Sequence, residues 1–233
     1  MTSEETLIDH YVTETGAMLA RLGDHLLTLD ELRDSQKHVS LDAFGLTESA
    51  PNSENVAALL SSHAERYDVH MANYLRYAHV VLTYMIFEDR LQAFGRIVAA
   101  TKRGAPFLTK SNRGLMPQFE QYLTSLKLPI PPNGGIDALR RLRNCVVHAR
   151  GHMRGAKNTA QLESLVGSLE GVSVDEAGYL SFTTEGCLLL QEQAIHYLHS
   201  IDSAAGFSMW IPDAVRANFE RNIRPHLQRQ AGQ

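Results

Sequence analysis

A long stretch from Asn55 to Arg103 dominates the architecture of this chain, because it has no proline and only one glycine, Gly95. Its apolar side chains recur three and four residues apart, which is the spacing of one face of an α-helix. They are Val56, Leu59, Leu60, Tyr67, Met71, Tyr74, Leu75, Ala78, Leu82, Met85, Ile86, Phe94 and Ile97. We expect one very long helix here, or two helices that break near residues 76–79. Such length favours a helical bundle.

Most of the remaining chain is also expected to be helical. The same spacing predicts helices at 3–34, 117–126, 136–150, 157–170, 184–204 and 213–222. Gly, Pro, Ser and Asn predict connections at 36–53, 104–114 and 128–135. Residues 172–174 and 179–183, on either side of a turn at Gly178, predict a β-hairpin. We therefore predict a single all-α domain over residues 1–233 with one small hairpin.

The composition agrees with a globular protein, since 44% of the 233 residues are hydrophobic and 21% are charged. The two cysteines, Cys145 and Cys187, are too few for a disulfide scaffold or a four-thiolate zinc site. The acidic N-terminus has no basic and apolar signal-peptide pattern. The longest mostly apolar stretch, Val80 to Phe87, is too short to span a bilayer. We expect a soluble cytoplasmic protein without a membrane partner.

The net charge of −4 is unevenly distributed. Residues 90–119 and 138–162 each contain six basic residues and no acidic one, whereas the rest of the chain holds all 26 acidic residues. Two basic segments in a mildly acidic protein predict a local surface for an anionic ligand. The alternative is that both segments form ordinary solvated helix faces.

The segment Ala138–Gly151 carries the most informative side chains. On an ideal helix its buried face consists of Leu139, Leu142, Cys145, Val146 and Ala149. The opposite face presents Arg140, Arg141, Asn144 and His148, and Arg143 lies at the border. Val147 lies among these polar residues, so we expect another helix or a second subunit to cover it.

Arg143, Asn144 and His148 form a chemically suggestive group. A guanidinium binds phosphate in a fork, and an imidazole transfers protons near neutral pH. Without clustered carboxylates for a metal, this group suits cleavage of a phosphodiester that carries its own nucleophile, as RNA does. The alternative is structural: Arg143 pairs with a carboxylate such as Glu88, and His148 is a packing histidine.

The hexapeptide Arg143–His148 resembles the Arg-x4-His signature of the HEPN superfamily. Leu142 before it and Gly151 after it match the L-R-N-x-x-x-H-x-x-G form of many bacterial members. The upstream stretch Phe87–Leu91 and the hairpin after the motif are also similar to family members. The resemblance covers about residues 60–205. The predicted helices 3–34 and 213–222 would pack on this core.

The resemblance implies a HEPN-like helical bundle that forms a homodimer, with two motif helices facing each other. It implies a metal-independent endoribonuclease without a cofactor, with a toxin or antiphage (abortive infection) role and an antitoxin or defence-system partner protein. Arg143 would bind the scissile phosphate, His148 would transfer a proton, and Asn144 would position the phosphate or His148. Glu88 would support Arg143. The position two residues after the histidine is Arg150, not the tyrosine that a toxin subgroup has for modification.

The basic surface suggests which further residues contact RNA, and we expect these to be Arg140, Arg141, Arg150 and Arg154. A non-catalytic alternative uses the same surface to hold RNA, nucleotide or a partner protein on a scaffold. We expect no metal site, because the histidine pairs 63/70 and 196/199 lack an evident third ligand. Cys145 is predicted to pack in the core.

Overall fold

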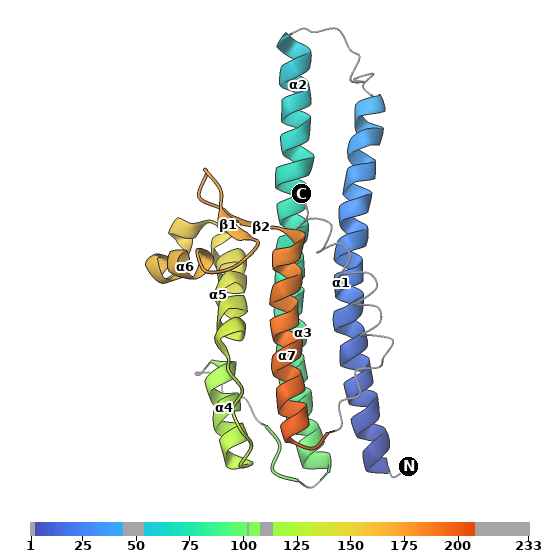
Figure 1. Cartoon of the computed structure of the whole chain (residues 1–233), viewed down its shortest axis with the longest axis vertical. Helices are drawn as coiled ribbons and strands as arrows, with labels where there is room; N and C mark the ends of the chain where they lie inside the picture. The colour runs from blue at the N-terminus through green and yellow to red at the C-terminus, as the bar shows by residue number, and fades with distance from the viewer. Residues whose placement is uncertain (1–2, 44–53, 102, 108–113, 208–233) are drawn as a thin grey trace.

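Figure 1 shows the protein as a computed structural model, which describes residues 3–43, 54–101, 103–107 and 114–207. Apart from one two-stranded sheet, the described residues form an all-α fold, as predicted. The first helix, α1 (Ser3–Ala43), packs beside α3 (Ala72–Ala100) and α7 (Thr184–Ala204). The predicted helix at 213–222 lies outside the described residues.

The long stretch after residue 54 forms a nearly continuous column of helix (Figure 1). It consists of α2 (Glu54–Ala64), a π-helical turn η1 (Glu65–Met71) and α3. The irregularity therefore lies at 65–71 and not at 76–79, where Tyr77 and His79 are buried within an unbroken helix. None of residues 56–71 is buried, whereas Ala72 is only 1% exposed. The bundle core begins where the π-helical turn ends.

The N-terminal helix α1 is longer than the sequence predicted. It continues past residue 34 to Ala43, through a segment that we expected to be a connection. The first helix-breaking residues after it are Gly45 and Pro51, so nothing in 36–43 forces the helix to end. Lys37 forms an ion pair with Asp68 of the π-helical turn at 2.5 Å. This pair links the extended end of α1 to the neighbouring column.

A second layer is formed by α4 (Leu115–Ser125) and α5 (Gly134–Ala149), which follow each other along one side of α3 and α7 (Figure 1). The predicted proline-rich breaker separates these two helices. Aromatic rings join the layers. The centre of the Phe94 ring of α3 lies 5.7 Å from that of Phe119 of α4 and 5.4 Å from that of Phe207, which follows α7. Edge-on ring pairs at such distances stabilise a core beyond simple burial.

The chain after α5 forms a short 3₁₀ turn η2 (Met153–Gly155), α6 (Thr159–Val166), and the predicted hairpin of β1 (Val172–Val174) and β2 (Leu180–Phe182). The hairpin pairs Val172 with Phe182 and buries Leu180 and Phe182. Thr183 then caps α7, because its hydroxyl accepts a hydrogen bond from the Gly186 amide at 3.0 Å. None of the helices within the described ranges combines the length and apolar character needed to cross a bilayer.

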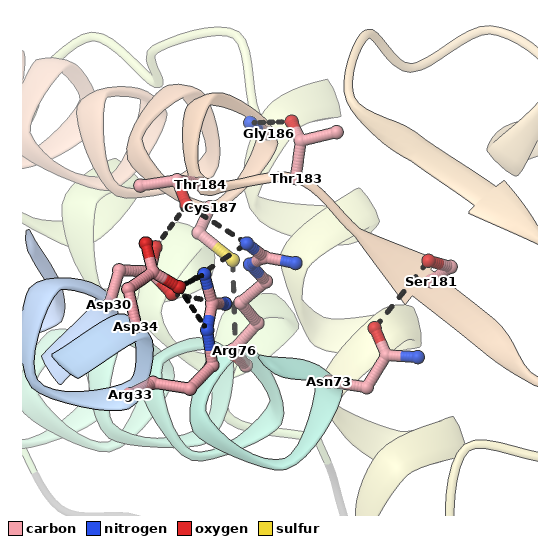
Figure 2. A network of polar contacts seen from close by, with 10 residues as sticks. All are labelled: Asp30, Arg33, Asp34, Asn73, Arg76, Ser181, Thr183, Thr184, Gly186 and Cys187. Carbon is pink, nitrogen blue, oxygen red and sulfur yellow. Dashed lines mark hydrogen bonds and ion pairs between the residues drawn. The ribbon is translucent and has the colours of Figure 1, made fainter. Parts of the chain in front are cut away.

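Polar contacts tie α1, α3 and α7 together near the hairpin (Figure 2). The Asp30 carboxylate of α1 accepts hydrogen bonds from Arg33 at 2.9 Å and from the Thr184 hydroxyl at 2.5 Å. Arg76 of α3 lies 3.7 Å from the same carboxylate. Each of the three helices thus contributes to one network, which fixes their register at the level of the hairpin.

A buried ion pair joins α3 and α7 deeper in the bundle. Arg90 donates to Asp202 at 2.8 Å, and the two side chains are only 3% and 1% exposed. Burial raises the pKa of the Asp202 carboxyl to about 6, although Arg90 opposes the shift. Burial lowers the pKa of Arg90 to about 10. Two charges held in the core make this contact sensitive to the loss of either partner.

Candidate functional site

The helix α5 orients the predicted site as its sequence pattern indicated. Leu139, Leu142 and Cys145 are buried against the bundle, whereas Val147 and His148 are exposed. The helix ends after Ala149, where Arg150 and Gly151 adopt left-handed backbone conformations. His148 therefore lies in the last turn of α5, open to solvent and accessible to a ligand.

The end of α5 is fixed by a close approach of Tyr77 to Gly151. The Tyr77 hydroxyl donates to the Leu180 carbonyl at 2.5 Å, and the Leu180 amide donates to the Gly151 carbonyl at 2.8 Å. A Cβ on Gly151 would collide with the Tyr77 ring and hydroxyl, and Gly151 has a φ of +80°. Burial and the nearby Cys145 raise the pKa of Tyr77. These contacts hold the helix end, and with it His148, against the hairpin.

A pocket of about 650 Å³ opens beside this helix. Asn144 and His148, predicted to share a surface, both line it, and so do Arg140 and Arg141. The rest of the lining comes from the stretch between Gly155 of η2 and Leu162 of α6, and it includes Lys157 and Asn158. The full lining comprises Arg140, Arg141, Asn144, Cys145, His148, Ala149, Gly155, Ala156, Lys157, Asn158 and Leu162. The structure thus gathers four of the predicted residues around one cavity.

Arg143 is not among the residues that line this pocket. Its guanidinium carbon lies 5.8 Å from the centre of the Tyr84 ring on α3, a cation–π distance. Its Nη1 donates to the Asn144 Oδ1 at 3.0 Å. Within one chain Arg143 therefore contacts the pocket only through Asn144. The phosphate-binding role that the resemblance implied for Arg143 stays a prediction.

Glu88 lies on the same side of α3 as Tyr84. Burial is the main cause that raises the pKa of the Tyr84 phenol, and the negative charge of the Glu88 carboxylate is the second cause. Within the described part of the chain, Glu88 forms no ion pair with Arg143. Glu88 and Arg143 instead both interact with Tyr84, Glu88 from the same helix and Arg143 from α5.

An acidic residue lies closer to the predicted RNA contacts than the charge count suggested. Asp137, immediately before the acid-free segment, forms ion pairs with Arg140 at 2.5 Å and with Arg141 at 2.6 Å. Burial alone would raise the pKa of Asp137, but hydrogen bonds from both arginines outweigh it and lower that pKa. Part of the positive charge on this face is therefore neutralised within α5 itself.

The remaining predicted RNA contacts lie outside the pocket. Arg150 is exposed in the left-handed cap after α5, and Arg154 is exposed in η2. The Arg154 amide donates to the His152 Nδ1 at 3.2 Å, which places a second histidine next to the motif helix. In the sequence Arg150 follows the lining residue Ala149 and Arg154 precedes the lining residue Gly155, but neither arginine lines the pocket itself.

The structure adds pocket residues that we had not singled out, above all Lys157 and Asn158. Asn158 has a φ of +60° and adopts a left-handed conformation at the N-cap of α6. Lys157 belongs to the basic segment, so the charge pattern contained its signal, but no periodicity predicts that it lines the same pocket as His148. Cys145 packs in the core as predicted, and burial raises the pKa of its thiol to about 11.

Among the described residues, no three His, Cys, Asp or Glu side chains gather closely enough to hold a metal ion. The polar side chains that line the pocket supply guanidinium, ammonium, amide and imidazole groups. This set binds anions and transfers protons. No protein-family model, curated protein or solved structure matches this chain.

Proposed function

We propose that this protein is a metal-independent endoribonuclease whose site includes His148, Asn144 and Arg143. One observation carries the proposal: Asn144 and His148, one helical turn apart, line the same open pocket as Arg140, Arg141 and Lys157. A proton-transferring imidazole beside several cations is the environment that a phosphodiester needs for attack by its own 2′-hydroxyl. The Arg-x4-His resemblance supports the same reaction.

The reaction needs two proton movements and no external nucleophile. The 2′-oxygen of the ribose attacks phosphorus and loses its proton, the bond from phosphorus to the 5′-oxygen breaks, and that oxygen takes up a proton. The products are a 2′,3′-cyclic phosphate and a 5′-hydroxyl. His148 is the group that takes part in these proton transfers, and the neighbouring cations stabilise the additional negative charge on the phosphoryl oxygens.

Arg143 enters this proposal through a second chain. In a homodimer, residues from both chains complete each site, and Arg143 need not share a pocket with His148 of its own chain. Exposed apolar side chains on α3 and α5 support such contact. On α3 these are Tyr74 (70% exposed), Leu82 (43%) and Met85 (52%), and on α5 it is Val147 (44%). Burial of such side chains favours association.

The cellular role that fits this activity is that of a toxin or an antiphage ribonuclease in the cytoplasm. A ribonuclease of this kind needs a means of restraint, so we propose an antitoxin or defence-system protein as a second partner. Arg150 stands where a modifiable tyrosine would be required, so restraint by tyrosine modification is not part of the proposal.

RNA cleavage in EDTA tests the proposal directly. Wild type is compared with His148→Ala and Arg143→Ala, with His199→Ala on α7 as a control outside the pocket. We expect wild type and the control to produce 2′,3′-cyclic phosphate ends and the two site variants to lose at least a hundredfold in rate. Equal cleavage by all four proteins would reject the assignment, because the activity would then come from elsewhere.

A non-catalytic scaffold is the second candidate, and the position of Arg143 outside the pocket favours it. Such a protein would bind RNA, a nucleotide or a partner protein on the same face without turnover. It predicts salt-dependent RNA binding that weakens when Arg140, Arg141 or Arg154 is neutralised. Cleavage that depends on His148 would exclude it, and affinity that survives all three changes would contradict it.

A further inference from the structure

The pocket beside α5 has two chemically different parts. Its rim carries the polar and charged side chains Arg140, Arg141, Asn144, His148, Lys157 and Asn158. Its apolar lining, which we call the floor, consists of Cys145 and Leu162, which belong to the hydrophobic core, and of Ala149 and Ala156, which pack against that core. A phosphodiester group on its own would contact only the polar and charged side chains of this rim. The apolar floor therefore indicates that another part of the ligand, less polar than phosphate, enters the pocket.

The size of the cavity leads to the same view. A volume of about 650 Å³ lies within the range of about 300–1,000 Å³ that is typical of pockets for organic ligands. A phosphate group alone would leave most of this space and the apolar floor in contact with water. A purine or pyrimidine attached to its sugar is flat, largely apolar on its faces and polar at its edges, which matches a floor and rim of this composition.

The polar groups at the rim differ in which of their hydrogen-bonding atoms remain available for a ligand. Asp137 binds Arg140 and Arg141, and Gln161 also accepts from the Arg141 Nη1 at 2.9 Å, so the Arg141 guanidinium is held in one orientation. Asn144 accepts from Arg143 through Oδ1, which leaves its amide NH₂ to donate. Lys157 is exposed and forms no ion pair with a carboxylate of the described residues.

We propose that this pocket takes a single unstacked nucleotide of the RNA, with its base against Ala156 and Leu162 and its phosphate near Lys157 and His148. The fixed guanidinium of Arg141 offers a plane for stacking, and the Asn144 amide contacts the ligand edge. This inference rests on the proposed function and adds how the substrate is held. It also means that a nucleotide must leave its helical stack before it reaches His148.

Titration calorimetry on the full chain tests the inference with defined small ligands. The four nucleoside 5′-monophosphates are compared with ribose 5-phosphate, which has the same phosphate and sugar but no base. We expect at least one nucleotide to bind ten times more tightly than ribose 5-phosphate. Equal affinities for all five ligands would overturn the base pocket.

Two variants locate the binding. Ala156→Leu adds bulk to the floor, and we expect it to weaken nucleotide binding at least fivefold without changing the affinity for ribose 5-phosphate. Ala160→Leu is the matched control, because Ala160 is exposed on α6 and does not line the pocket. If both variants weaken nucleotide binding equally, the floor is not where the base lies. Thermal melting establishes that both variants fold.

A third variant separates this inference from the nuclease proposal. Lys157→Gln removes an exposed charge from the rim, so we expect it to weaken nucleotides and ribose 5-phosphate by the same factor. Base-selective binding without RNA cleavage in EDTA would support the pocket and argue against the nuclease. Cleavage without any preference for nucleotides over ribose 5-phosphate would overturn the pocket and leave the nuclease proposal intact.

Discussion

The guanidinium of Arg143 donates a hydrogen bond of 3.0 Å to the amide oxygen of Asn144, and the two side chains lie in different environments on α5. Arg143 lies over Tyr84 between α5 and α3, whereas Asn144 lines the pocket. Within one chain, Arg143 can influence the pocket only by orienting this amide. The bond directs Oδ1 toward the arginine and leaves the NH₂ group as the donor for a ligand.

We therefore expect the NH₂ group of Asn144 to contribute to RNA binding as a hydrogen-bond donor. Asn144→Asp replaces that donor by a negative charge in the pocket, so we expect RNA affinity to fall at least tenfold, and Asn144→Ala to have a smaller effect. Fluorescence anisotropy with a 2′-O-methyl RNA oligonucleotide measures binding without cleavage. Gln92→Glu, an exposed position on α3, adds the same charge elsewhere. An equal loss in that control would show that net charge alone is responsible.

Asp137 restrains two of the cations that face the pocket. Asp137→Asn removes its ion pairs with Arg140 and Arg141, so we expect RNA affinity to rise and its dependence on salt concentration to steepen. The same change removes an acidic residue from the first turn of α5 and should lower the free energy of unfolding by about 0.3–1 kcal/mol. Binding isotherms at several salt concentrations, together with urea unfolding, measure both effects. Unchanged salt dependence would mean that these arginines do not contact RNA.

Gly151 and Gly134, at the two ends of α5, should respond oppositely to alanine. Gly151→Ala forces a Cβ into Tyr77 at a positive φ, so we expect a loss of at least about 2 kcal/mol in the free energy of unfolding. Nothing lies within 4 Å of a Cβ on Gly134, and Gly134→Ala should be neutral or stabilising by up to about 1 kcal/mol. Urea unfolding of both variants gives the comparison. Similar stabilities would show that the Tyr77 contact does not constrain the helix end.

The buried carboxyl of Asp202 predicts a specific pH dependence. Its native pKa of about 6 lies above the ordinary value of 3.8, so the native state binds more protons than the unfolded chain between these pH values. The contribution of this group to stability therefore decreases as the pH rises from about 4 to about 6 and stays constant above that. Asp202→Asn cannot titrate. The stability of wild type relative to this variant should fall across that window in urea unfolding, and a constant difference would contradict the raised pKa.

The elements around the site were predictable where local chemistry decides them. Gly151 marks the end of α5, the proline-rich segment separates α4 from α5, and alternating residues around Gly178 indicate the hairpin. The two faces of α5 also follow from helical periodicity alone. The position of Asp137, three and four residues before Arg140 and Arg141, is a signal of the same local kind, and a count limited to the acid-free segment missed it.

Other features depend on contacts between distant segments and left no pattern in the sequence. The polar residues after position 34 suggested a connection, but the pairing of Lys37 with Asp68 accompanies a continued helix. Helical periodicity placed Arg143 at the border of two faces, and its contact with Tyr84 of α3 could not be predicted from that position. Lys157 and Asn158 line the pocket just before α6, and the left-handed conformation of Asn158 is not something that periodicity describes.

The π-helical turn at Glu65–Met71 divides one column of helix into two regions of unequal local stability. Residues 56–71 bury no side chain, so opening of their amides exposes little apolar surface, whereas opening of α3 breaks the core from Ala72 onward. Hydrogen exchange along this single column should therefore change abruptly at the turn, with fast amides on the α2 side and slow ones on the α3 side. A ligand or partner that slows exchange only on the α2 side would reveal a binding surface remote from His148.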